Sequence, residues 1–96
     1  MRRKARIDSN QPQIIETFRA MGASVAPTHT LGAGFPDLVV GWRGINLLVE
    51  IKDGDKPPSK RQLTEDEQRW HEDWRGNVVI VESVGDAINL LNGVGR

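Results

Sequence analysis

The chain has 96 residues, of which 38% are hydrophobic and 27% are charged, as is typical of one soluble globular domain. It contains no cysteine, which excludes a disulfide framework and a thiol nucleophile, and it has no apolar run near the roughly 18 residues of a membrane span. Thirteen basic and thirteen acidic residues give a net charge of zero, so the overall charge does not indicate a nucleic-acid partner. No apolar signal-peptide segment follows the basic start, and we therefore expect a cytoplasmic location.

Basic residues are concentrated in two segments of this single predicted domain, residues 1–96. One is an N-terminal arm, residues 1–9, and the other is a loop, residues 53–63, that contains two prolines and is expected to be mobile. Either segment could bind phosphate groups, and the alternative is ordinary solvated surface charge. The candidate nucleic-acid contacts in the two segments are Arg2, Arg3, Lys4, Lys56, Lys60 and Arg61.

The first predicted helix begins after Asn10, which can cap it, and Pro12 is tolerated in the first turn. Ile14 and Phe18 recur at helical spacing before Gly22 ends the helix. Residues 23–28 are short and partly apolar, which favours a strand, and residues 31–36 form a glycine-rich turn.

Two strands rich in Leu, Val and Ile are predicted at residues 37–41 and 45–52, as the arms of a hairpin. If the turn is centred on Arg43 and Gly44, paired residues have numbers that sum to about 87, and Asp37 lies opposite Glu50. Trp42 is then at the hairpin tip. Its indole is expected to be exposed, where it would either fill a dimer interface or stack on a base.

A second helix is predicted to begin at Thr64, with Glu67 completing a capping box. Trp70 and Trp74 share a face of this helix one turn apart, which favours burial in the core over base stacking. A strand at residues 77–82 and a last helix at 83–91, capped by Ser83, complete the order α-β-β-β-α-β-α.

The remaining candidate motifs favour structural interpretations. Residues 32–34, Gly-Ala-Gly, lack the Lys-Ser/Thr of a phosphate-binding loop, so a permissive turn is expected and no nucleotide cofactor. Residues 53–55, Asp-Gly-Asp, lack the closing glutamate of a calcium loop and are read as a turn. His29 and His71 are isolated, and structural or solvent roles are favoured, although His29 could touch a phosphate.

The residues with the clearest chemical implication are Asp37, Glu50 and Lys52, which the predicted hairpin brings together. Carboxylates that face each other across strands repel, so a fold that keeps them together is expected to hold a cation. Oxygen ligands without His or Cys suit Mg²⁺ or Mn²⁺. Such an ion can activate water and polarise a phosphodiester, while the adjacent lysine stabilises the charged transition state. The pattern therefore predicts phosphodiester hydrolysis.

At this point the sequence resembles a known family. Pro36-Asp37 followed by Glu50-Ile51-Lys52 is similar to the PD-(D/E)xK nuclease signature, and the wider frame resembles the VRR-NUC (virus-type replication-repair nuclease) domain in its stand-alone, phage-type form. The residues that carry the wider resemblance are Asn10-Gln11, the segments 32–38 and 49–52, Ser59, Leu63-Thr64, Gln68, Trp74 and Gly76.

The resemblance implies a restriction-endonuclease-like α/β core with a mixed central sheet flanked by helices. It also implies metal-dependent DNA cleavage by a homodimer similar to archaeal Holliday-junction resolvases, in a bacterial or phage-infected cell. Asp37 and Glu50 would be metal ligands, the carbonyl of Ile51 a further ligand, and Lys52 the catalytic lysine. Gln68 would orient a water molecule or Lys52.

The sequence departs from the family pattern at one position. Many related nucleases carry a glutamate on the first helix that reaches the metal, and Gln11 holds that place here. Glu16 is the only acid within the predicted helix, and it points away from the apolar face. Gln11 is therefore favoured as an outer or weak metal neighbour and Glu16 as solvated surface, while the number of bound ions stays open.

The sequence thus predicts a metal-dependent DNA endonuclease that acts on branched DNA as a homodimer, without membrane association. Two alternatives remain. One is a DNA-binding or scaffolding module on the same fold that does not cleave, and the other is a nuclease that acts on RNA or other phosphodiesters. The two facing carboxylates argue against a binding-only module, because they would repel incoming phosphates.

Overall fold

The structure is a computed structural model that describes residues 7–94 of the chain, and its core is a four-stranded mixed sheet. The basic residues Arg2, Arg3 and Lys4 lie outside the described residues. The elements are α1 (Gln11–Ala20), β1 (Ser24–Pro27), the 3₁₀ turn η1 (His29–Leu31), β2 (Leu38–Trp42), β3 (Ile45–Ile51), the 3₁₀ turn η2 (Pro58–Lys60), α2 (Glu65–Asp73), β4 (Val78–Val81) and α3 (Val84–Asn92). The predicted α-β-β-β-α-β-α order is confirmed.

The sheet has the strand order β1-β2-β3-β4, in which the first two pairs are antiparallel and β3 pairs with β4 in parallel. The hairpin of β2 and β3 turns on Arg43 and Gly44, whose φ angles are 50° and 81°. Positive φ at both central residues is the geometry of the two-residue turn that matches the twist of the flanking strands. The partners Leu38 and Val49, and every pair after them, have numbers that sum to 87, which confirms the predicted register.

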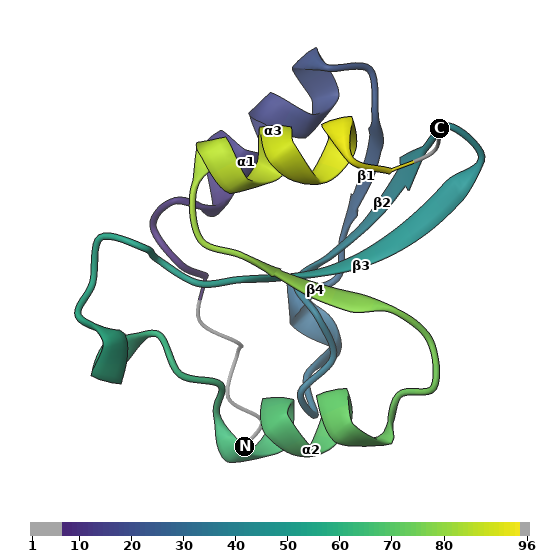
Figure 1. The fold of residues 1–96 in the computed structure, drawn as a ribbon. Helices are drawn as coiled ribbons and strands as arrows, with labels where there is room; N and C mark the ends of the chain where they lie inside the picture. The colour runs from purple at the N-terminus through teal and green to yellow at the C-terminus, as the bar shows by residue number, and fades with distance from the viewer. Residues whose placement is uncertain (1–6, 95–96) are drawn as a thin grey trace.

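α1 and α3 lie side by side on one face of the sheet, and α2 lies on the other side (Figure 1). Alternate residues of β2 and β3 point toward α1 and α3 and are fully buried, among them Val40, Val49 and Ile51. Ile14 and Phe18 from α1 and Leu91 from α3 close this core. None of the helices among residues 7–94 has the length and apolar character needed to cross a membrane.

α2 begins with the predicted capping box: the Thr64 hydroxyl accepts from Glu67 N, and the Glu67 carboxylate accepts from Thr64 N at 2.9 Å. The glycine-rich turn lies directly against this helix start. Gly34 has a φ of 82°, and a Cβ at Gly34 would collide with the backbone carbonyl of Asp66. The turn therefore fixes where α2 sits, and it requires glycine both for conformation and for space.

The burial predicted for Trp70 and Trp74 is wrong. α2 contains no buried residue, and Trp74, at the end of the helix, is 44% exposed. The two rings stack on each other with centroids 4.6 Å apart, and the Phe35 ring meets Trp70 edge-on at 5.2 Å. Helical spacing placed both indoles on one face correctly, but only the turn containing Phe35 packs against that face.

The exposed indole predicted for Trp42 is also wrong. Trp42 is partly buried against the core, its Nε1 donates to the carbonyl of Leu91 at 3.0 Å, and the Arg43 guanidinium lies over its ring. The indole therefore joins the hairpin tip to the C-terminal end of α3, so neither of the exposed roles predicted for it applies in this structure.

Candidate active site

Asp37, Glu50 and Lys52 come together at the C-terminal end of β3, as the hairpin register predicts. Asp37 precedes β2, and its Oδ2 accepts a hydrogen bond of 2.7 Å from the backbone N of Ile51. Lys52 Nζ lies 3.8 Å from Glu50 Oε2. The backbone N of Lys52 donates to Val81 O at 3.0 Å, which extends the β3–β4 pairing. Neighbouring strands therefore hold all three side chains.

Glu50 is the most strongly perturbed group of this cluster. It is 1% exposed, and burial, together with the adjacent Asp37 and Glu67, raises its pKa to about 10. Burial also raises the pKa of Asp37, although the hydrogen bond from Ile51 N opposes that effect. The two carboxyl groups thus hold protons more tightly than free carboxylic acids, because burial dominates even though Lys52 Nζ is 3.8 Å from Glu50 Oε2.

Lys52 is paired with Glu67, a residue that the sequence analysis assigned only to the capping box. Lys52 Nζ donates to Glu67 Oε1 at 2.7 Å, and both side chains are largely buried. Burial acts to lower the pKa of Lys52, but Glu67 outweighs it and the net shift is upward. Burial likewise acts to raise the pKa of Glu67, and the hydrogen bonds from Lys52 and Thr64 N make the net shift downward. Both groups are therefore held in their charged forms.

His71 is the second residue that sequence reasoning did not assign to the site. Its Nε2 lies 4.0 Å from Glu50 Oε1, and both atoms are buried without a hydrogen-bond partner within the described part of the chain. Burial lowers the pKa of His71. Glu67 and His71 are one turn apart on α2, so the spacing of four residues was a signal that they share a face of the helix, without showing what that face packs against.

Gln68, by contrast, is exposed on α2, and its Nε2 donates to Glu72 at 3.4 Å. In this structure the residue of α2 that contacts Lys52 is Glu67, one position earlier. The reason is helical geometry: adjacent residues are about 100° apart around the axis, so Glu67 and Gln68 cannot both face the sheet.

Gln11 and His29 form a separate polar pair at the start of α1. Gln11 is 2% exposed, and the distance from its Nε2 to His29 Nδ1 is 3.3 Å. Its Oε1 is buried without a partner among the described residues. Glu16 is exposed, as predicted. The preceding residue, Asn10, does not cap α1 with its side chain but donates from Nδ2 to the carbonyls of Lys52 and Glu82 at 3.1 and 3.2 Å, which ties the helix start to this site.

The three basic residues of the loop differ in their contacts. Lys56 Nζ is 3.9 Å from Asp8, and Arg61 Nη1 is 3.3 Å from Glu82 Oε2 and also donates from Nε to the carbonyl of Lys56. Lys60 is exposed at the end of η2. Lys56 and Arg61 are thus held by acidic neighbours, while Lys60 is exposed.

The donor atoms suit a hard cation that keeps several of its waters. Residues 7–94 contain no group of three or more His, Asp or Glu side chains arranged to hold a metal ion. Two adjacent carboxylates are nevertheless present, Glu50 Oε1 has no hydrogen-bond partner in the described region, and the Ile51 carbonyl belongs to the same strand end. Mg²⁺ is commonly bound through one or two carboxylates plus water, so the residues fit such an ion.

A mixed sheet with helices on both faces, and an Asp, a Glu and a Lys at its centre, define a nuclease-like α/β fold. A solved structure described as a "VRR_NUC domain" is 32% identical to this chain, with a TM-score of 0.63, and the match covers 85% of this chain and 89% of that one. No protein-family model and no curated protein matches the sequence. The chain belongs to the VRR-NUC family, which the sequence resemblance predicted.

Proposed function

We propose that the protein is a divalent-metal-dependent endonuclease that hydrolyses phosphodiester bonds in DNA. The observation that carries the proposal is the buried arrangement of Asp37, Glu50 and Lys52 on neighbouring strands, in a chain with a nuclease fold. The burial of two adjacent carboxyl groups is unfavourable for a fold. A role in holding a cation accounts for their retention at one strand end.

Asp37, Glu50 and the carbonyl of Ile51 would hold Mg²⁺ or Mn²⁺, and Gln11 would be an outer neighbour. When bound, the ion supplies Lewis-acid stabilisation of the phosphate and an acidified water. Asp37 is oriented by its hydrogen bond from Ile51 N, and its position is therefore fixed before any ligand arrives. Preorganised groups of this kind require little rearrangement during the reaction.

Lys52 would place its ammonium group against the charge that develops on the phosphate. Its contact with Glu67 holds Nζ at one position and keeps it protonated. Glu67 is thereby a positioning residue for Lys52, a role that we assign in place of the one expected for Gln68. His71, behind Glu50, limits the positions that the Glu50 carboxylate can take.

The finer parts of the proposal are a branched DNA substrate and a homodimer. A chain of 96 residues offers little surface for direct base reading, and two copies about a two-fold axis would bring two sites to two strands. The exposed Lys60 on the basic loop supports a polyanionic substrate.

The test is cleavage of a labelled four-way junction beside a linear duplex and an RNA duplex of the same sequence. Each is incubated with Mg²⁺, Mn²⁺ or EDTA, using wild-type protein and Lys52→Ala. We expect metal-dependent cutting that Lys52→Ala abolishes without loss of DNA affinity, with the junction cut faster than the duplex. Tight binding with no cutting in any metal would favour a scaffolding module, and faster cutting of RNA would reassign the substrate.

A further inference from the structure

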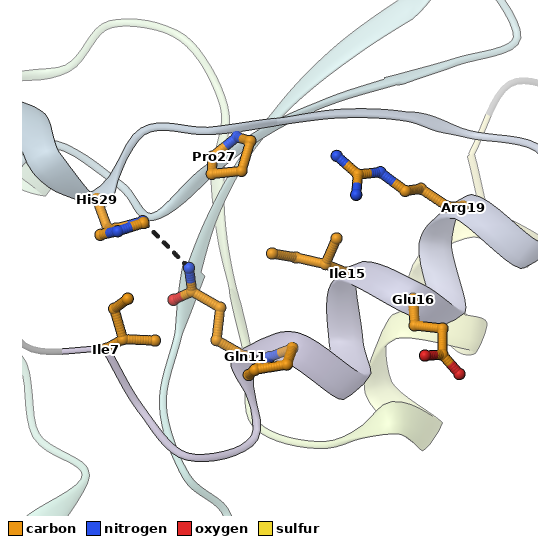
Figure 2. Close-up of a pocket in the computed structure, with 8 residues that line it drawn as sticks. Ile7, Gln11, Ile15, Glu16, Arg19, Pro27 and His29 are labelled. Carbon is orange, nitrogen blue, oxygen red and sulfur yellow. Dashed lines mark hydrogen bonds between the residues drawn. The ribbon is translucent and has the colours of Figure 1, made fainter.

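A cleft of about 470 Å³ lies on the outer side of α1, against the end of β1 and η1 (Figure 2). This volume falls within the roughly 300–1,000 Å³ of small-ligand pockets. Its walls are mainly apolar, formed by Ile7, Pro12, Ile15 and Pro27. Ile7 is 48% exposed, so an apolar surface faces solvent here without a covering element among the described residues.

One end of the cleft is polar. Gln11 and His29 meet there, as the dashed line in Figure 2 shows, and the two side chains lie 3.3 Å apart. Gln11 is almost completely buried, yet its Oε1 has no hydrogen-bond partner within residues 7–94. A buried amide oxygen without a partner is unfavourable, so this end of the cleft is suited to a ligand that carries a donor group.

The charged residues of the lining are Glu16 and Arg19, at the other end of the cleft. Their charged groups point in different directions from α1 (Figure 2), and Arg19 Nη2 donates to the carbonyl of Val25 at 3.2 Å. Arg19 therefore already has a partner within the protein. Apolar walls with hydrogen-bonding groups at one end are the lining that enzymes use to hold an unstacked nucleobase.

The polar end adjoins the candidate active site on two sides. Asn10, the residue before Gln11, donates to the carbonyl of Lys52. Thr28, the residue before His29, donates from its backbone N to the carbonyl of Asp37 at 2.7 Å. The polar end of the cleft is therefore tied, through Asn10 and Thr28, to the backbone of Lys52 and Asp37.

From these observations we infer that the cleft receives one unpaired nucleobase of the DNA substrate, next to the phosphodiester that is cut. Ile7 and Ile15 contact the faces of the base, and Gln11 and His29 bind its edge. This inference rests on the proposed nuclease function and specifies its substrate class: DNA with an unstacked nucleotide beside the cleavage point, as is found at flaps, bulges and junctions.

The experiment compares two duplexes that carry a single unpaired nucleotide at the cleavage point, one with its base and one with an abasic tetrahydrofuran in its place. Affinity is measured with Lys52→Ala protein, which separates binding from cutting, and kcat/KM is measured with the otherwise wild-type chain. We expect the base to increase both quantities about tenfold, the effect of one stacked base. Ile7→Ala and Ile15→Ala should reduce that ratio toward one, mainly by weakening the substrate with the base.

Ile88→Ala is the matched control, because Ile88 is 38% exposed on α3 and does not line the cleft. It should leave the base-to-abasic ratio unchanged. Equal affinity for both substrates in the parent protein would overturn the inference, even where metal-dependent cleavage by Lys52 establishes the nuclease. So would an Ile7→Ala variant that weakens both substrates equally and shifts the protein from dimer to monomer in light scattering, because the cleft would then be a contact between copies. If the protein does not cut DNA in any metal, the ratio of affinities for the base-containing and abasic substrates still tests the inference.

Discussion

Glu67 Oε1 accepts hydrogen bonds from both Lys52 Nζ, at 2.7 Å, and the backbone N of Thr64, at 2.9 Å. One carboxylate oxygen therefore takes part in the N-terminal cap of α2 and also binds the ammonium group of the candidate catalytic lysine. The position of the helix and the position of the lysine are coupled through this atom.

The first prediction separates these two roles. Glu67→Ala should lower the cleavage rate at least tenfold, because Lys52 loses the partner that positions it, and should also destabilise α2. Thr64→Ala removes the cap but keeps the contact with Lys52, so it should lower stability by about 1 kcal/mol with cleavage close to wild type. Cleavage kinetics and thermal melting of both variants provide the check. Equal cleavage rates in the two variants would show that Glu67 acts only as a cap.

The second prediction concerns the pH dependence of stability without metal. The folded chain holds Glu50 at a pKa of about 10 against an ordinary value of 4.5, so the folded state keeps a proton that the unfolded chain releases between these values. The free energy of unfolding should therefore fall as pH rises from 7 to 9, by at most about 1.4 kcal/mol per pH unit. Glu50→Gln should flatten this dependence and raise the melting temperature at pH 9, while it abolishes cleavage.

Thermal melting at pH 7, 8 and 9 in EDTA measures this effect. This pH range lies above the pH at which His71 titrates, since burial lowers the pKa of that residue from 6.5. Glu16→Gln, an exposed change on α1, is the matched control and should follow the wild type. A Glu50→Gln protein with the wild-type pH slope would contradict the buried, protonated state of Glu50.

The third prediction concerns the contact between Gly34 and α2. Gly34→Ala should destabilise the protein by about 1–3 kcal/mol, because the added methyl group meets the Asp66 backbone and φ is 82°. Gly44 has a φ of 81° but nothing within 4 Å of its Cβ position, so Gly44→Ala isolates the backbone effect alone. The difference between the two melting temperatures measures the collision. If Gly34→Ala is no worse than Gly44→Ala, the turn does not fix the position of α2.

The fourth prediction tests the position found for Trp42. Trp42→Phe removes the hydrogen bond to Leu91 O and should lower stability by about 0.5–1.5 kcal/mol, with DNA affinity and oligomeric state unchanged. Chemical denaturation, DNA titration and light scattering on the same preparation are the measurements. A loss of DNA affinity with full stability would instead restore the base-stacking role that its place in the hairpin turn suggested.

The fifth prediction concerns the basic loop. Lys60→Ala removes an exposed cation of the basic loop and should reduce the slope of log affinity against log salt by about 0.9 if Lys60 contacts one phosphate. The combined change of Lys56, Lys60 and Arg61 to Ala should weaken binding further. Arg75→Ala, exposed after the end of α2, is the control. An unchanged slope in the triple variant would remove the loop from the DNA-binding surface.

Local rules account for what the sequence predicted correctly. The turn at Arg43 and Gly44 sets the hairpin register, and the register brings Asp37 next to Glu50, so the centre of the site follows from the chain between them. The cap at Thr64 likewise follows from four consecutive residues. Each of these predictions needs only the geometry of one turn.

Predictions that depended on how elements pack were less successful. Glu67 and His71 reach the site only because α2 crosses the face of the sheet at Glu50, which no pattern within the helix reveals. Trp70 and Trp74 have the spacing of a core pattern, but their rings stack on each other and Trp74 is 44% exposed at the end of α2. A helix face is buried only where another element packs against it, and that element lies elsewhere in the chain.

The side chain of Asn10 joins segments that are far apart in the chain, since Lys52 lies 42 positions and Glu82 72 positions further along. β4 also supplies the carbonyl of Val81 that binds Lys52 N, so the lysine is not anchored until residues 78–82 have been synthesised and paired. Long-range contacts of this kind form late in folding. A chain still emerging from the ribosome would therefore lack an assembled site. It could not cleave nucleic acid until folding is complete.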